Sequence, residues 1–114
     1  MMNMAIAMML TLAAAKADPQ DEARRAFNNC LFETHNTAVE AKKSASSFND
    51  DIQKACTDTR KAYFDIIVKN ERGYGSSQKD AEAYANEEVQ SVVDAVTSAY
   101  GENLSSGATL ILEK

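Results

Sequence analysis

Apolar residues recur every three or four positions along three long stretches of this chain. Residues with that spacing share one face of an α-helix, so the pattern predicts amphipathic helices. The predicted helices cover residues 19–41, 46–70 and 77–100. Because each apolar face must be buried against another element, we expect an all-α protein that folds as a three-helix bundle.

Residues with known preferences for helix ends support these boundaries. Asp18 followed by Pro19 is typical of a helix start, because the aspartate caps the first amides and proline needs no donor there. Ser77, with an acid three residues later, resembles a capping box. Gly101 is expected to end the third helix. The helical domain is therefore expected to span residues 18–101.

Cys30 and Cys56 are the only two cysteines in the sequence. They fall on the first and second predicted helices, so a disulfide between them would staple these helices into an antiparallel hairpin. If the two cysteines lie at the same height along the antiparallel helices, the turn lies midway between them, at residues 41–46. Ser47, however, resembles a later start of the second helix. No Gly or Pro lies in this turn, so serines are expected to make it. The bridge should stabilise the fold by about 3.5 kcal/mol on a chain-entropy estimate. The alternative is that both cysteines are reduced thiols.

Residues 1–17 have the pattern of a signal peptide. The run from Met1 to Leu12 is almost continuously apolar but too short to span a bilayer, and Ala15-Lys16-Ala17 has the small-x-small form of a cleavage site. We therefore predict an exported protein, periplasmic or secreted, in a compartment where the disulfide can form. The alternative is an uncleaved N-terminus that anchors the chain to a membrane.

Residues 102–114 are expected to form a poorly ordered C-terminal tail. Their Leu110-Ile111-Leu112 run is β-prone, but the sequence shows no other strand with which it could pair. The tail could instead add a strand to the sheet edge of a partner.

The charge balance argues against some classes of partner. The chain has 12 basic and 17 acidic residues, which give a net charge of −5 at pH 7. Its basic residues are scattered and form no stripe among aromatic residues. We therefore expect no binding to nucleic acid or to anionic membrane surfaces.

The sequence contains no evident catalytic or metal-binding motif. His35 is the only histidine, and the residues three or four positions from it include no carboxylate that could orient its ring. The acidic pairs Asp50-Asp51 and Glu87-Glu88 consist of neighbours, which point about 100° apart on a helix and do not face one another. We therefore expect no enzyme activity, no cofactor and no metal ion.

Apolar residues in excess of one stripe per helix indicate where a partner would bind. Phe32 and Val39 form a second stripe on the first helix, and residues 62–68 are apolar nearly all round the second. The candidate interaction residues are Phe32, Val39, Tyr63, Phe64, Ile67 and Val68. We expect a non-catalytic exported protein that binds another protein, itself or an envelope ligand. The alternatives are a stress or chaperone-like factor, and a small metal-binding protein or enzyme that uses His35.

Overall fold

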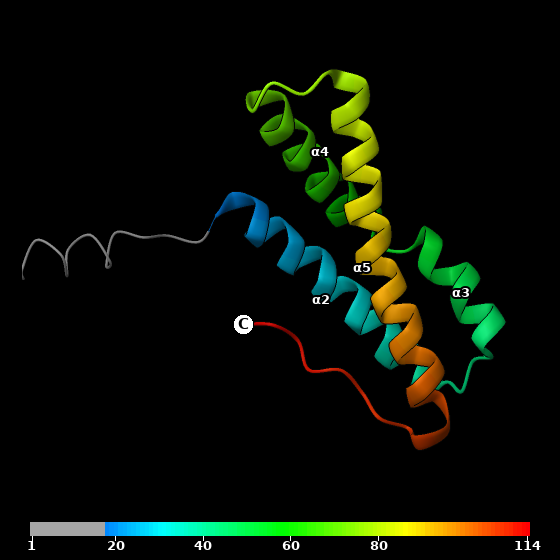
Figure 1. Cartoon of the computed structure of the whole chain (residues 1–114). Coiled ribbons are helices and arrows are strands. Elements are labelled where there is room, and N and C mark those ends of the chain that lie inside the picture. The colour runs from blue at the N-terminus through cyan, green and yellow to red at the C-terminus, as the bar shows by residue number, and fades with distance from the viewer. Residues whose placement is uncertain (1–17) are drawn as a thin grey trace, which may run out of the picture.

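The computed structural model describes residues 18–114, and the predicted signal peptide lies outside the described residues. The described chain forms the helices α2 (Pro19–Glu40), α3 (Ala45–Lys54), α4 (Thr57–Gly73) and α5 (Gln78–Ser106), and it contains no strand (Figure 1). The prediction of an all-α protein is confirmed. The prediction of three helices is wrong, because residues 18–114 contain four.

Local capping sets the start of three of these helices. The Asp18 carboxylate accepts a hydrogen bond at 3.2 Å from the amide two residues later. The hydroxyls of Ser44 and Ser77 each accept one at 3.1 Å from the amide three residues later. These bonds satisfy amides that have no partner within the helix. The helix starts predicted at Asp18 and Ser77 are therefore confirmed.

The turn between α2 and α3 lies within residues 41–46, as expected, but a lysine makes it. Lys42 has a φ of 54°, in the left-handed region. Its amide donates to the Val39 carbonyl at 3.1 Å, and the Lys43 amide donates to the Ala38 carbonyl at 3.0 Å. This pair of bonds is the Schellman motif, in which glycine usually takes the left-handed position. Serine caps the following helix instead of making the turn.

The predicted helix over 46–70 is two helices, α3 and α4. The break falls at Ala55 and Cys56, where Ala55 is extended and Cys56 has a left-handed φ of 62°. The apolar spacing continues across this break, so the sequence pattern does not reveal it. The change of direction brings Cys56 to α2, where it forms the disulfide.

Helix α5 is longer than predicted because Gly101 does not end it. Gly101 is helical, and the helix continues to Ser106, where Gly107 caps it with a φ of 77°. A glycine inside a helix costs about 1 kcal/mol relative to alanine. The added turn places Leu104 against the core, and this packing offsets that cost.

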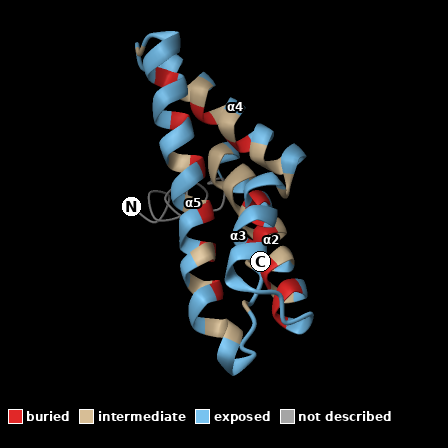
Figure 2. Ribbon diagram, turned by 90° about the vertical axis from the view of Figure 1, so that its right-hand side faces the viewer, coloured by how far each residue is buried: buried red, intermediate tan, exposed pale blue. Residues whose placement is uncertain are grey.

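Helices α2 and α5 contact one another, and each also contacts both α3 and α4 (Figure 1). The buried residues lie on the faces that these helices turn toward each other (Figure 2). At the end where α2 and α5 both finish, the Tyr100 hydroxyl donates to the carbonyls of Ala38 and Lys43. The Tyr100 ring stacks on Phe48 of α3 at a centroid distance of 3.9 Å. Hydrogen bonding and aromatic packing by Tyr100 therefore join α3 to α2 and α5.

The poorly ordered tail expected from the sequence is not confirmed. After Gly107 the chain turns back and runs antiparallel to α2, as Figure 1 shows in red. Backbone groups of Leu110 and Glu113 are hydrogen-bonded to side chains of α2. The segment is thus held in an extended conformation on a helix, without a sheet.

Candidate functional site

Two asparagines of α2 hold the backbone of the C-terminal tail. The Asn36 amide oxygen accepts from the Leu110 N–H at 2.8 Å, and its Nδ2 donates to the Leu110 carbonyl at 2.9 Å. Asn29 makes the same two bonds with the backbone of Glu113, at 2.7 and 2.8 Å. Each amide therefore satisfies both backbone groups of one residue, as a neighbouring β-strand would. Such contacts hold an extended chain whatever its side chains are.

The side chain of Glu113 is recognised separately by charge. Arg24 approaches its carboxylate with two guanidinium nitrogens, at 3.0 and 3.1 Å, and Asn28 also donates to it. The hydrogen bond from Arg24, followed by that from Asn28, holds the pKa of Glu113 below its usual range. Paired, planar donors of this kind give geometric selectivity for a carboxylate. Asp21 shares Arg24 at 3.1 Å and helps to orient it.

Leu110 supplies the apolar contact of the tail. It is half-buried and borders a pocket of about 250 Å³ between the tail, α2 and α5. The pocket is lined by Asn28, Phe32, Ala95, Val96, Ala99 and Leu110. The next residue, Ile111, is 89% exposed. The tail therefore turns Leu110 and Glu113 toward α2 and leaves Ile111 facing solvent.

His35 supports this site from the interior. It is fully buried, with Nδ1 2.8 Å from the Asn36 amide oxygen and Nε2 3.2 Å from Asn103 Nδ2. Because that oxygen only accepts, the proton is assigned to Nδ1, and Nε2 accepts from Asn103. The Asn36 oxygen thus receives donors from both His35 and Leu110, which fixes the orientation of its amide. The single histidine of the sequence is therefore an interior residue.

Both ring nitrogens of His35 are therefore engaged by asparagine amides. Its ring also packs edge-on against Phe48 and Tyr100, with centroid distances of 6.2 and 5.6 Å. In the part of the chain that the structure describes, no group of three His, Cys, Asp or Glu side chains is placed to hold a metal ion. The histidine is thus part of the packed interior.

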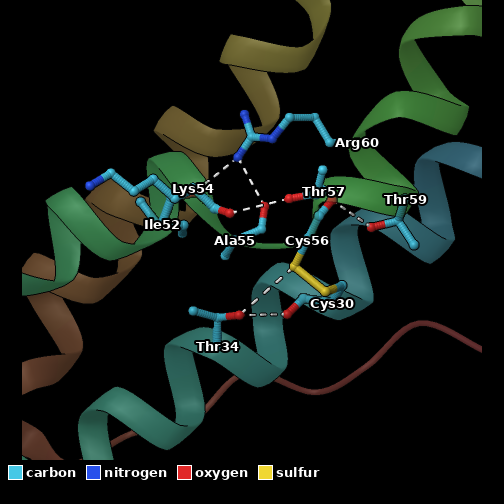
Figure 3. Close-up of a disulfide and its surroundings, with 9 residues drawn as sticks. All are labelled: Cys30, Thr34, Ile52, Lys54, Ala55, Cys56, Thr57, Thr59 and Arg60. Carbon is cyan, nitrogen blue, oxygen red and sulfur yellow. Dashed lines mark hydrogen bonds between the residues drawn. A yellow bond between two sulfur atoms is a disulfide. The ribbon is translucent and has the colours of Figure 1, made fainter.

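The disulfide fixes α2 from its other side (Figure 3). Cys30 and Cys56 are bonded, with a Cα–Cα distance of 6.0 Å, as the sequence predicted. Arg60 braces the same junction, because its guanidinium donates to the carbonyls of Ile52 and Ala55 at 2.9 and 3.2 Å. Burial lowers the pKa of Arg60. Because Cys30 lies between Asn29 and Asn36 in α2, the bridge restrains the helix that carries both asparagines.

The interaction residues proposed from the sequence fall into two groups. Val39, Tyr63 and Ile67 are buried in the core, so they do not face a partner in this conformation. The other three, Phe32, Phe64 and Val68, are half-buried. Of these, Phe32 lies beside the tail in the pocket that Leu110 borders.

The polar residues of the tail-binding surface were not identified from the sequence. This surface, as named here, consists of Arg24, Asn28, Asn29, Phe32 and Asn36 of α2. The seven-residue spacing of Asn29 and Asn36 puts them on one helix face, and that spacing is visible in the sequence. Polar residues on an exposed helix face are common, however, and their partners lie more than seventy positions away.

Comparisons with known proteins found no matching family model, curated protein or solved structure. No helix within residues 18–114 is long and apolar enough to cross a membrane. The described chain is thus a four-helix, disulfide-bonded domain that holds one extended segment of itself on α2.

Proposed function

We propose that this chain is a small exported, non-catalytic binding protein, and that the tail-binding surface of α2 binds an extended segment of another protein. The pairing of Asn29 and Asn36 with the backbone of the tail carries the proposal. Side-chain amides that hydrogen-bond to both the N–H and the C=O of a residue can bind any polypeptide in an extended conformation. In the structure both amides are engaged by the chain's own tail, which shows the kind of segment they bind.

Export is supported by two independent features. The disulfide between Cys30 and Cys56 is compatible with an oxidising compartment, since cytosolic thiols are kept reduced. Residues 1–17 have the composition of a signal peptide with a small-x-small cleavage site. The proposed location is the periplasm or the extracellular space.

The surface on α2 replaces the apolar helix faces as the proposed binding site. Half of the residues suggested by the sequence pattern lie in the core, whereas the tail-binding surface combines backbone pairing, a carboxylate site and an apolar contact. Phe32 belongs to both, because it borders the pocket beside Leu110. No chemistry is assigned to this surface, and the proposed activity is binding alone.

The test uses the oxidised full chain with its own tail weakened. Leu110→Asp together with Glu113→Lys, named here the tail-release variant, removes the apolar contact and places a cation opposite Arg24. The amides at positions 110 and 113 should then exchange rapidly with solvent, which verifies release. A fluorescein-labelled peptide of residues 107–114 should bind this variant, as measured by fluorescence anisotropy.

The matched control is Ile111→Asp, which changes an outward-facing side chain. It should leave the tail in place, so that little peptide binds. Adding Asn29→Ala and Asn36→Ala to the tail-release variant should abolish binding while the circular dichroism spectrum stays helical. A released tail with no peptide binding would refute the proposed function.

A further inference from the structure

We infer that the tail-binding surface selects segments with an apolar residue followed, three positions later, by Asp or Glu, and that the tail competes with them as an intramolecular occupant. This inference rests on the proposed function and specifies its partner.

The register follows from matching lengths. Asn29 and Asn36 are seven residues apart, and α-helical residues rise 1.5 Å each, so the two amides are separated by about 10.5 Å along α2. Leu110 and Glu113 are three residues apart, and an extended chain advances roughly 3.1 to 3.4 Å per residue, or about 9 to 10 Å over that interval. The two asparagine amides therefore match the backbone of an extended segment at positions that are three residues apart, and at no other whole number of residues.

The acidic position is selected by Arg24, which contacts it directly. Arg24 forms the two-nitrogen contact with the Glu113 carboxylate, and the Arg25 charge adds a weaker favourable field. The ion pair is partly shielded, since the side chains of Arg24 and Glu113 are 33% and 31% exposed. A lysine at this position would face Arg24 across the same distance, so a basic segment is disfavoured.

The apolar position is selected by the packing of Leu110 against the core, on the side where Phe32 lies. Between the two selected positions, Ile111 is 89% exposed and contributes little to docking. The surface thus contacts two side chains and the backbone of the tail, and it leaves Ile111 free. The tail meets both requirements, and it is attached to α5 through Gly107.

Attachment makes the tail a strong competitor. A tethered segment has an effective concentration in the millimolar range, so the tail occupies most of the surface when its intrinsic Kd lies well below that range. The apparent Kd of an outside segment is raised in inverse proportion to the fraction of the surface that is free. A partner that binds the wild-type chain must therefore displace the tail.

The experiment measures peptide affinities for the tail-release variant with Arg24 and with Arg24→Ala. The probes are the labelled peptide of residues 107–114 and the same peptide carrying Glu113→Lys, Leu110→Asp or Ile111→Asp. With Arg24, the native peptide should bind at least about tenfold more tightly than the Glu113→Lys peptide, and Arg24→Ala should remove most of this difference. The Leu110→Asp peptide should bind weakly, and the Ile111→Asp peptide like the native one.

Occlusion is tested with the wild-type chain. The native peptide should bind it at least about tenfold more weakly than it binds the tail-release variant, and equal affinities would overturn the competitor role. Equal binding of the Glu and Lys peptides, both dependent on Asn29 and Asn36, would overturn the selectivity and leave the proposed function intact. Absence of binding by every peptide would overturn both. Arg24→Lys, which keeps the charge, should retain the preference for the native peptide.

Discussion

Lys42 and Cys56 are the non-glycine residues with a left-handed backbone within residues 18–114. Such a conformation brings the side-chain Cβ close to the following carbonyl and costs roughly 1 to 2 kcal/mol. At Cys56 the conformation serves the disulfide. At Lys42 it closes α2, where the side chain is exposed and forms no ion pair with another residue of the described range 18–114.

Replacing Lys42 with glycine should therefore stabilise the protein. Lys42→Gly is expected to raise the free energy of unfolding by about 1 kcal/mol, because glycine adopts this φ without steric cost. Lys42→Ala, which keeps the Cβ, is the matched control and should change it by less than about 0.5 kcal/mol. Urea denaturation of the oxidised protein gives both values. A Gly variant no more stable than the Ala variant would show that the turn carries no strain.

Glu113 makes docking of the tail dependent on pH. Its pKa in the folded protein lies below its ordinary value of 4.5, so its contribution to docking is complete above that value and is lost as the pH falls through the lowered one. The tail should therefore leave α2 in acid, as followed by the NMR shifts of the Leu110 and Glu113 amides. Glu113→Gln is the control, because it removes the carboxylate of Glu113 and leaves the contact between Asp21 and Arg24 in place. If the same transition persists in Glu113→Gln, another group is responsible.

At the scale of elements, the junction of α3 and α4 shows how a helical pattern can be interrupted. Helix α3 ends with carbonyls that lack partners within the helix. Arg60 supplies donors to the carbonyls of Ile52 and Ala55, and its guanidinium lies 5.3 Å from the ring centroid of Phe27. One side chain thus caps α3 and links α4 to α2.

Removing the half-buried Arg60 should destabilise the protein more than removing an exposed charged residue does. Arg60→Ala is expected to lower the free energy of unfolding by about 1 to 3 kcal/mol, through the lost hydrogen bonds and the lost cation–π contact. Arg60→Lys should recover only part of this, since an ammonium cannot reproduce the planar donor geometry. The neighbouring Lys61→Ala removes an exposed pair with Asp65 and should cost less than about 0.5 kcal/mol. Equal losses from Arg60→Ala and Lys61→Ala would exclude the bracing role.

At the scale of the whole molecule, α2 is held on several sides. Its asparagines pair with the tail, its apolar residues pack into the core, and Cys30 is bonded to the α3–α4 junction. The disulfide closes a loop of 26 residues in sequence separation. This loop restricts the unfolded chain, and it also restrains the helix that forms the tail-binding surface.

Loss of the disulfide should lower the free energy of unfolding by about 3.5 kcal/mol on the chain-entropy estimate. The change is Cys30→Ala with Cys56→Ala, and urea denaturation of the oxidised wild type and the double variant gives the difference. Adding a reductant should destabilise the wild type and have no effect on the double variant. A difference below about 1 kcal/mol would show that the bridge contributes little to the fold.

The features that could be predicted from the sequence depend on residues close together in the chain. Asp18 and Ser77 cap amides within three residues of themselves, and the apolar spacing within each stretch defines a helix face. The pairing of Cys30 with Cys56 needed no long-range information, because the chain has no other cysteine. These signals were sufficient for the all-α class and for the position of the first turn.

Only the tertiary structure decided the rest, because the deciding contacts join distant residues. The break at Cys56 lies inside an uninterrupted apolar pattern, and Gly101 stays helical because the next turn packs on the core. His35 is buried by aromatic rings from α3 and α5. Asn29 meets the backbone of Glu113 across 84 positions of sequence. The energy of each contact depends on where its partner is folded, which local propensity and spacing do not encode.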